Sequence, residues 1–235
     1  MLGRVILFLG APGSGKGTQS SWLSSHLGIP CLSTGEALRA EAKRDTTAGV
    51  RLRRTLASGS LVSDEIVCEV VGARLWRDAP TGLILDGFPR TVAQARRLDS
   101  MLTDLGLPGA LVFHLDVSKN LLLRRLTARR HCAVCGMVYN LISRPSLRGA
   151  RCENDGGLLV ERDDDAEAVV LRRLDAFEAT SAPLFDYYRG RDFHRIDGDR
   201  ALDSVAAELL EVAAGDALCM NAQADAATTS RVLCA

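Results

Sequence analysis

The sequence predicts an α/β fold in which a five-stranded parallel sheet is flanked by helices. Short apolar runs rich in Val, Ile and Leu recur at the length of buried strands, and stretches with helical spacing separate them. We expect strands at Val5–Leu9, Ile29–Leu32, Leu83–Leu85, Leu111–Leu115 and Phe193–Ile196. We expect helices at Thr18–His26, Asp64–Arg77, Val92–Leu105, Lys119–Arg129 and Ala166–Arg189. Because strand and helix alternate, the strands should pair in parallel with helices on both faces.

A glycine-rich loop, Gly10 to Thr18, connects the first expected strand to the first expected helix. Its sequence is typical of a phosphate-binding loop, and it lies in the strand-to-helix setting that such a loop requires. The glycines let backbone N–H groups turn toward phosphates, the helix N-terminus favours negative charge, and Lys16 can bridge the β- and γ-phosphates. The alternative is an ordinary glycine-rich turn with an incidental lysine. Lysine is scarce here, since the 29 basic residues include only Lys16, Lys43 and Lys119, and this scarcity disfavours the alternative.

Residues 33–62 are too long for a simple crossover and carry helical patterns of their own. They begin with Ser33-Thr34-Gly35-Glu36, which has the spacing of a capping box. We therefore expect a small helical insertion. The next expected strand ends at Asp86, where a carboxylate would be unfavourable unless it served a partner. A cap or turn aspartate is the alternative reading of Asp86.

Residues 130–162 lose the helical period and become rich in Gly, Pro, Cys and Arg, which predicts a separate small module. The pattern Cys132-x₂-Cys135-x₁₆-Cys152-x₂-Asp155 has the spacing of a zinc knuckle, with a carboxylate in place of a fourth thiolate. Four protein ligands leave no open position, so the Zn²⁺ would be structural. His131 is an alternative ligand. Reduced cysteines in a metal-free flap are the alternative to a metal site.

Composition limits the classes of partner. The formal net charge of the 235 residues is zero, which gives no general attraction to nucleic acid or to an anionic membrane. The early apolar run Val5–Leu9 is too short to span a bilayer and has no cleavage site after it. We therefore expect a cytoplasmic protein whose polyanionic ligands are small.

The loop motif, Gly-x-Pro-Gly-x-Gly-Lys-Gly-Thr, resembles that of the nucleoside monophosphate kinases, and of the adenylate kinases above all. Further motifs of that family follow in order: Ser33-Thr34-Gly35-Glu36-x-Leu38-Arg39, Gly59-Ser60-Leu61-Val62, Leu85-Asp86-Gly87-Phe88-Pro89-Arg90-Thr91, Gln94, Arg162-Asp163-Asp164 and Arg173. The resemblance covers roughly residues 4–212. It implies a P-loop NTPase fold and reversible, Mg²⁺-dependent transfer of the γ-phosphoryl group of ATP to AMP, giving two ADP. It also implies a monomer, with ATP, AMP and ADP as its partners.

The resemblance assigns roles to particular residues. It implies that ATP is bound by Gly13, Ser14, Gly15, Lys16, Gly17, Thr18, Arg125, Arg129, Val138, Tyr139 and Arg200. It implies that AMP is bound by Thr34, Arg39, Ser60, Leu61, Val62, Gly87, Phe88, Pro89, Arg90, Gln94, Arg162 and Arg173. The catalytic set would be Lys16, Arg90, Arg129, Arg162, Arg173 and Asp86, with Asp86 holding Mg²⁺. No general base is expected, because the AMP phosphate is already anionic. Asp163, Asp164 and Asp165 could orient the arginines, or could form a solvated helix start.

The domain organisation follows from these motifs. The core would comprise residues 1–32, 63–125 and 164–212; residues 33–62 would be the AMP-binding insertion and residues 126–163 a lid with the zinc knuckle. The insertions would close over the two nucleotides and exclude water, which would otherwise hydrolyse ATP. The Ala-rich residues 213–235 are expected to be a loosely ordered tail.

Two other functions remain open at this point. A UMP/CMP kinase, or another monophosphate kinase, is disfavoured by Thr34, since the pyrimidine enzymes usually carry Ala there. An inactive nucleotide-sensing protein is the other possibility. The departures from the family pattern are mild: Glu36 where Asp is more common, Ser63 where Pro is common, and the added tail.

Overall fold

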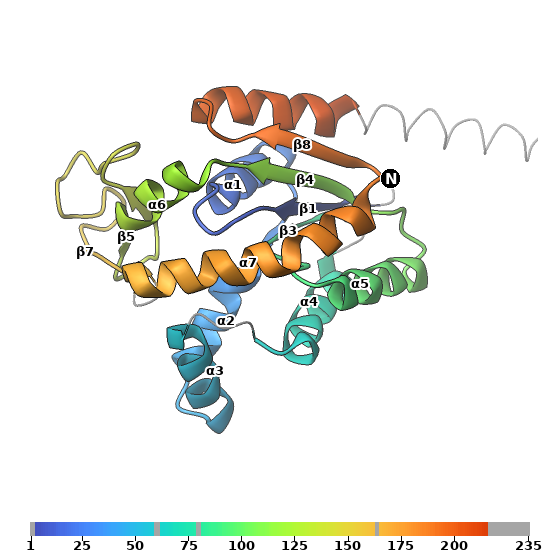
Figure 1. The fold of residues 1–235 in the computed structure, drawn as a ribbon, viewed down its shortest axis with the longest axis horizontal. Helices are drawn as coiled ribbons and strands as arrows, with labels where there is room; N and C mark the ends of the chain where they lie inside the picture. Colours follow the sequence, from blue (N-terminus) through green and yellow to red (C-terminus); the bar gives the residue numbers. More distant parts are fainter. Residues whose placement is uncertain (1–2, 59–61, 79–80, 163–164, 216–235) are drawn as a thin grey trace, which may run out of the picture.

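The core of the molecule is a parallel sheet of five strands (Figure 1). The computed structural model describes residues 3–58, 62–78, 81–162 and 165–215. The strands are β1 (Val5–Leu9), β2 (Cys31–Ser33), β3 (Leu83–Asp86), β4 (Leu111–Asp116) and β8 (Phe193–Asp197). Their order is β2-β3-β1-β4-β8, and every pairing is parallel. The predicted fold class is therefore confirmed.

Helices cover both faces of the sheet, as the alternation predicted. The helices of the core are α1 (Lys16–Leu27), α4 (Asp64–Asp78), α5 (Val92–Asp104), α6 (Lys119–Thr127), α7 (Glu167–Tyr188) and a final helix at residues 202–215. One apolar cluster joins alternate residues of β1 to α4, α5 and α7, and a second joins the intervening residues to α1 and the final helix. The two faces of β1 thus anchor the two helical layers, because successive strand side chains point in opposite directions.

The long connection after β2 is helical, as expected. It contains α2 (Thr34–Ala42) and α3 (Thr47–Ser58). Ser33 is the N-cap of α2, but its side chain accepts no capping hydrogen bond, so the expected capping box is not formed. The Thr34 hydroxyl instead lies 3.1 Å from the carbonyl oxygens of both Asp86 and Gly87, and ties the start of α2 to the end of β3.

The second insertion forms its own antiparallel sheet of β5 (Arg129–Cys132), β6 (Val138–Asn140) and β7 (Leu159–Val160), in the order β6-β5-β7. The helix expected to reach Arg129 ends at Thr127, so that prediction was wrong at its C-terminus. The reason is a competing set of hydrogen bonds: Asn140 Nδ2 donates to the Arg125 carbonyl, and the Leu141 N–H donates to the Ala128 carbonyl. The hairpin thus takes the carbonyls that a longer helix would need.

The C-terminal boundary also differs from the expectation. Residues 213–215 complete the final helix, and Ala213 is buried against Val205 and Leu209. The expected tail therefore begins too early at 213, because helical packing continues there. Residues 216–235 lie outside the described residues. Within the described part of the chain, no helix is both long and apolar enough to cross a membrane.

His114 on β4 makes stability depend on pH. The residue is 8% exposed, and its ring packs against Phe185, with 4.0 Å between ring centroids. Burial lowers the pKa of His114 to about 4 from its usual 6.5. Between those two pH values the unfolded chain binds more protons than the folded chain, so the free energy of unfolding falls as pH falls.

We expect His114→Phe to remove about 1–2 kcal/mol of the stability loss between pH 7 and pH 5. Urea unfolding at both pH values measures this difference. His26→Phe is the matched control, because His26 is exposed on α1. An unchanged pH dependence in the His114 variant would contradict the prediction.

Candidate functional site

The loop between β1 and α1 is shaped to receive an anion. Gly13 and Gly15 have φ values of 84° and 96°, which a residue with a Cβ rarely adopts. α1 begins immediately afterwards at Lys16, so its N-terminal N–H groups face the loop. The Ser14 N–H donates to the Ala11 carbonyl at 3.1 Å and closes the turn. The loop and the helix dipole together favour a phosphate group.

Lys16 fills the centre of this loop. Its Nζ donates to the carbonyl oxygens of Gly10 at 2.7 Å and Ala11 at 2.8 Å. Burial lowers the pKa of Lys16 to about 8; the Asp86 carboxylate acts in the opposite direction, while Arg90, Arg173 and Arg129 lower the pKa further. A phosphate would restore the favourable surroundings that the ammonium group loses on leaving water.

Asp86 lies at the end of β3, beside the loop. It is in register with Phe8 of β1 and is 9% exposed. A Cβ at Gly17 would lie 3.3 Å from Asp86 Oδ2, so the glycine lets the first turn of α1 approach the carboxylate closely. This close approach explains why glycine occupies position 17, directly before Thr18. The site lies where the chain switches from one side of β1 to the other, which is where ligands bind in parallel sheets.

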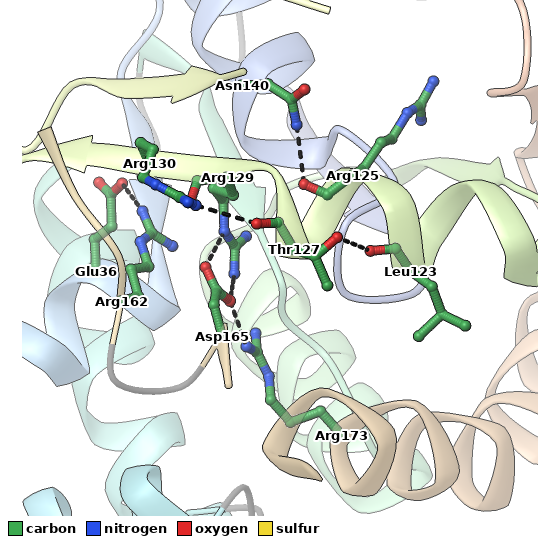
Figure 2. A network of polar contacts seen from close by, with 10 residues as sticks. All are labelled: Glu36, Leu123, Arg125, Thr127, Arg129, Arg130, Asn140, Arg162, Asp165 and Arg173. Carbon is green, nitrogen blue, oxygen red and sulfur yellow. Dashed lines mark hydrogen bonds and ion pairs between the residues drawn. The ribbon is translucent and has the colours of Figure 1, made fainter. Parts of the chain in front are cut away.

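Asp165 holds two of the predicted arginines together (Figure 2). Arg129 Nε donates to Asp165 Oδ2 at 2.6 Å, Arg129 Nη2 contacts Oδ1, and Arg173 Nη1 lies 3.3 Å from Oδ1. The Asp165 side chain is only 3% exposed. Of the three candidate aspartates it is therefore the one seen to orient arginines; Asp163 and Asp164 lie outside the described residues. The shared carboxylate offsets the repulsion between two guanidinium groups.

Arg162 joins the two insertions. Its Nη2 lies 3.9 Å from Glu36 Oε1, across the space between the end of the β-sheet insertion and α2 (Figure 2). The Arg162 side chain is largely buried, whereas Glu36 is 61% exposed. A ligand can therefore replace Glu36 as the partner of Arg162 at little cost in free energy, because Glu36 is already mostly in water.

A second group of predicted residues meets around Gly87. A Cβ at Gly87 would lie 3.3 Å from Arg90 Nη2 and 3.4 Å from Thr34 Oγ1, so these two side chains converge there. Arg90 Nε donates to the Gly87 carbonyl at 2.9 Å. The Arg39 guanidinium lies over the first turn of α2, 3.3 Å from where a Cβ of Gly35 would be.

The remaining predicted residues of this group differ in what they can offer a ligand. Gln94 is 3% exposed, and its amide oxygen and nitrogen each have one hydrogen-bond partner, the Arg90 N–H and the Asp64 carboxylate. Phe88 is buried in the core, so only its backbone can face a ligand, and Val62 packs against the same apolar cluster. Pro89 follows Phe88 through a cis peptide bond. Ser60 and Leu61 lie outside the described residues.

Three residues predicted to bind ATP have other partners. Tyr139 is 2% exposed, and its hydroxyl accepts from the Glu153 N–H at 2.9 Å within the cysteine cluster, so its ring is not accessible to a ligand. Arg125 Nη2 donates to the Gly198 carbonyl at 2.9 Å, close to the loop at Ser14. Arg200 pairs with Glu208 and Asp197. Val138, on β6, is half-buried.

The cysteine cluster brings four potential metal ligands together. One ligand atom from each of Cys132, Cys135, Cys152 and Asp155 lies within 4.8 Å of all the others. The Cys135 and Cys152 sulfurs are 3.6 Å apart, and Cys132 Sγ is 3.2 Å from Asp155 Oδ1. Hydrogen bonds from Cys135 and from the Gly157 N–H lower the pKa of Asp155, so it is a carboxylate at neutral pH. His131 is not part of this group, although it neighbours Cys132.

Comparison with known proteins gives a consistent result. The family model described as adenylate kinase matches residues 8–193. The adenylate kinase of Thermodesulfovibrio yellowstonii is 42% identical over 202 residues, covering 85% of this chain and 94% of that protein. That of Nitrosococcus oceani is 42% identical over 212 residues, covering 89% and 97%. That of Bacillus subtilis is 38% identical over 212 residues, covering 89% and 98%.

The lowered pKa of Lys16 predicts that anion binding weakens as pH rises. Below about 8 the ammonium is charged, and above it the charge is lost. We expect the affinity for inorganic tripolyphosphate, measured by calorimetry from pH 7 to 9, to fall through this range. Lys16→Met should bind more weakly and lack this step, while the titration of the ligand itself is common to both proteins. Parallel pH profiles for the two proteins would contradict the prediction.

Proposed function

The chain belongs to the adenylate kinase family, and we propose that the site around Lys16 transfers the γ-phosphoryl group of Mg·ATP to AMP, giving two ADP, in a reversible reaction. The observation that carries this proposal is the gathering of cations near the loop: Lys16 Nζ lies on the loop carbonyls, Asp165 holds Arg129 and Arg173 together, and the charges of these arginines reach Lys16. Such a ring of cations suits the charge that spreads over the transferring phosphoryl group.

The ATP would lie on the loop side. Backbone N–H groups of the loop and Lys16 would hold its phosphates, with Thr18 in the first turn of α1 beside them. Arg125, which already lies near the loop, would stack on the adenine. Tyr139 would contribute only its backbone, because its ring is buried, whereas Val138 is half-buried and could also offer its side chain.

The AMP would lie between α2 and the end of β3. Arg39, Arg90, Arg162 and Arg173 would face its phosphate, because planar guanidinium groups donate forked pairs of hydrogen bonds to a phosphate dianion. Thr34 and Gln94 would face the nucleoside. The AMP phosphate is its own nucleophile, so the protein needs no general base and contributes alignment and charge.

Magnesium fits the position of Asp86. Its nearly buried carboxylate stands at the end of β3, facing the first turn of α1, and oxygen ligands are those that Mg²⁺ prefers. When bound, Mg²⁺ would neutralise charge on the phosphates. Asp86 would orient it, with Glu36 in the first turn of α2 as an additional carboxylate.

Zinc fits the cysteine cluster. Three sulfurs and one carboxylate oxygen at mutual distances below 4.8 Å match the donors and the four-coordinate geometry that Zn²⁺ prefers. All four positions are filled by protein, so the metal would be structural. It would keep the β-sheet insertion rigid while that insertion closes over ATP and the α2–α3 insertion closes over AMP.

The other functions considered are not favoured. The relatives in the comparison are named adenylate kinases, not pyrimidine nucleotide kinases. The catalytic positions in the described residues carry suitable side chains, which does not favour an inactive sensor. We further propose that the protein acts as a monomer in the cytoplasm.

A direct assay tests the proposed reaction. Purified protein with Mg·ATP and AMP should form ADP, and Lys16→Ala or Arg90→Ala should lower kcat by roughly 10²–10³-fold or more, because each cation stabilises transition-state charge. Arg189→Ala is the control, since Arg189 follows the last residue of α7 and is exposed. ADP formation at a wild-type rate by either variant would count against the assignment.

Metal analysis tests the knuckle. We expect one zinc per chain, lost in Cys152→Ser together with a Tm roughly 5–10 °C lower, because each kcal/mol shifts the Tm of a chain this size by about 2–4 °C. Cys68→Ser on α4 lies outside the cluster and should keep the zinc, with a smaller loss of Tm because Cys68 is only half-buried against the core. A zinc-free protein, or a Cys152 variant with an unchanged Tm, would exclude a structural metal.

A further inference from the structure

A hydrogen-bond network at the start of α5 uses both ends of the Gln94 amide. Gln94 Oε1 accepts from the Arg90 backbone N–H at 2.7 Å, and Nε2 donates to Asp64 Oδ1 at 2.7 Å. The Thr91 hydroxyl donates to Asp64 Oδ2 at 2.7 Å and accepts from the Gln94 N–H at 3.1 Å. Because Gln94 is only 3% exposed, these bonds rather than water decide which way the amide points.

The two partners allow only one orientation of the amide. The Arg90 N–H can only donate, and an ionised Asp64 carboxylate can only accept. Turning the Gln94 amide by half a rotation would place its nitrogen against a donor and its oxygen against the carboxylate. Two buried hydrogen bonds would be lost, which makes the turned form roughly 100-fold less populated.

The orientation matters for a base that contacts this amide. An amide nitrogen has a second hydrogen and a carbonyl oxygen a second lone pair, so Gln94 can still offer one donor and one acceptor in a fixed order. A 6-aminopurine presents a donor next to an acceptor ring nitrogen, whereas a 6-oxopurine presents an acceptor next to a protonated ring nitrogen. An amide that could turn would pair with either; a locked amide pairs with one, since the phosphate and ribose fix the side from which the base approaches.

We propose that Asp64 is a positioning residue for base selection: it locks the donor–acceptor order of Gln94, so that the monophosphate site accepts a 6-aminopurine and rejects a 6-oxopurine. The inference rests on the proposed function, in which Gln94 contacts the base of AMP. Asp64 is also the first residue of α4, where a negative charge stabilises the helix start. A purely structural role of that kind would change stability but not the ratio between two substrates.

The test compares AMP with IMP. We expect Asp64→Asn, which can donate or accept toward Gln94, to lower the AMP-to-IMP ratio of kcat/KM about tenfold, mainly by raising kcat/KM for IMP, because only the Arg90 N–H then opposes the turned amide. Glu65→Gln is the matched control: it removes the same charge one residue along α4, is exposed, and should keep the wild-type ratio. Adding Asp64→Asn to Gln94→Met should have no further effect on the ratio, because Asp64 acts on the base only through Gln94.

The outcomes separate this inference from the proposed function. Wild-type protein that does not phosphorylate AMP would overturn the proposed function itself. Active wild-type protein with an Asp64 variant that keeps the AMP-to-IMP ratio would overturn only the role of Asp64. If Asp64→Asn does not fold, Asp64→Ser, which can also donate or accept toward Gln94, decides: an unchanged ratio overturns the role of Asp64, and a lowered ratio supports it.

Discussion

Cations that must meet phosphate groups repel one another before any phosphate arrives, and the geometry of the site offsets that repulsion. Lys16 donates to loop carbonyls and has a lowered pKa. The Asp86 carboxylate raises that pKa and so partly offsets the effect of the nearby arginines on Lys16. Arg129 and Arg173 share the buried Asp165. These internal carboxylates hold the guanidinium groups close together. Phosphate groups can then take the place of the carboxylates as partners without a large movement of the arginines. Catalysis by alignment and charge depends on such preorganisation.

The two insertions are stabilised by different physics. The helical one is joined to the main apolar cluster through Leu38, Ala42 and Leu52. The β-sheet one has a core of little more than Cys132, Tyr139 and Cys152, with Leu159 packed beside them. So small a core cannot by itself make this insertion rigid, and the proposed coordination bonds would replace packing. This also explains why Tyr139 is buried in the cluster instead of facing a nucleotide.

Short sequence patterns correctly predicted those features that depend on residues close together in the chain. The strand-to-helix turn around Lys16 and the strand end at Asp86 were predictable, because both depend on the ends of buried strands. Errors arose where a distant segment competed for the same backbone groups. The helix before Arg129 ends early because Asn140 and Leu141 bind its last carbonyls. Ser33 lacks its expected cap, and the neighbouring Thr34 binds carbonyl groups 52 and 53 residues away.

By itself the sequence determined the order of strands and helices, the phosphate-binding loop and the ligand types of the cysteine cluster, because spacing over a few residues specifies each of them. Only the tertiary structure decided which carboxylate serves which cation or amide. Asp165 pairs with Arg129 across 36 residues, and Asp64 pairs with Gln94 across 30. Such pairings depend on how separate elements pack together, and adjacent acids such as Asp64 and Glu65 look alike until the fold buries one contact and leaves the other in water.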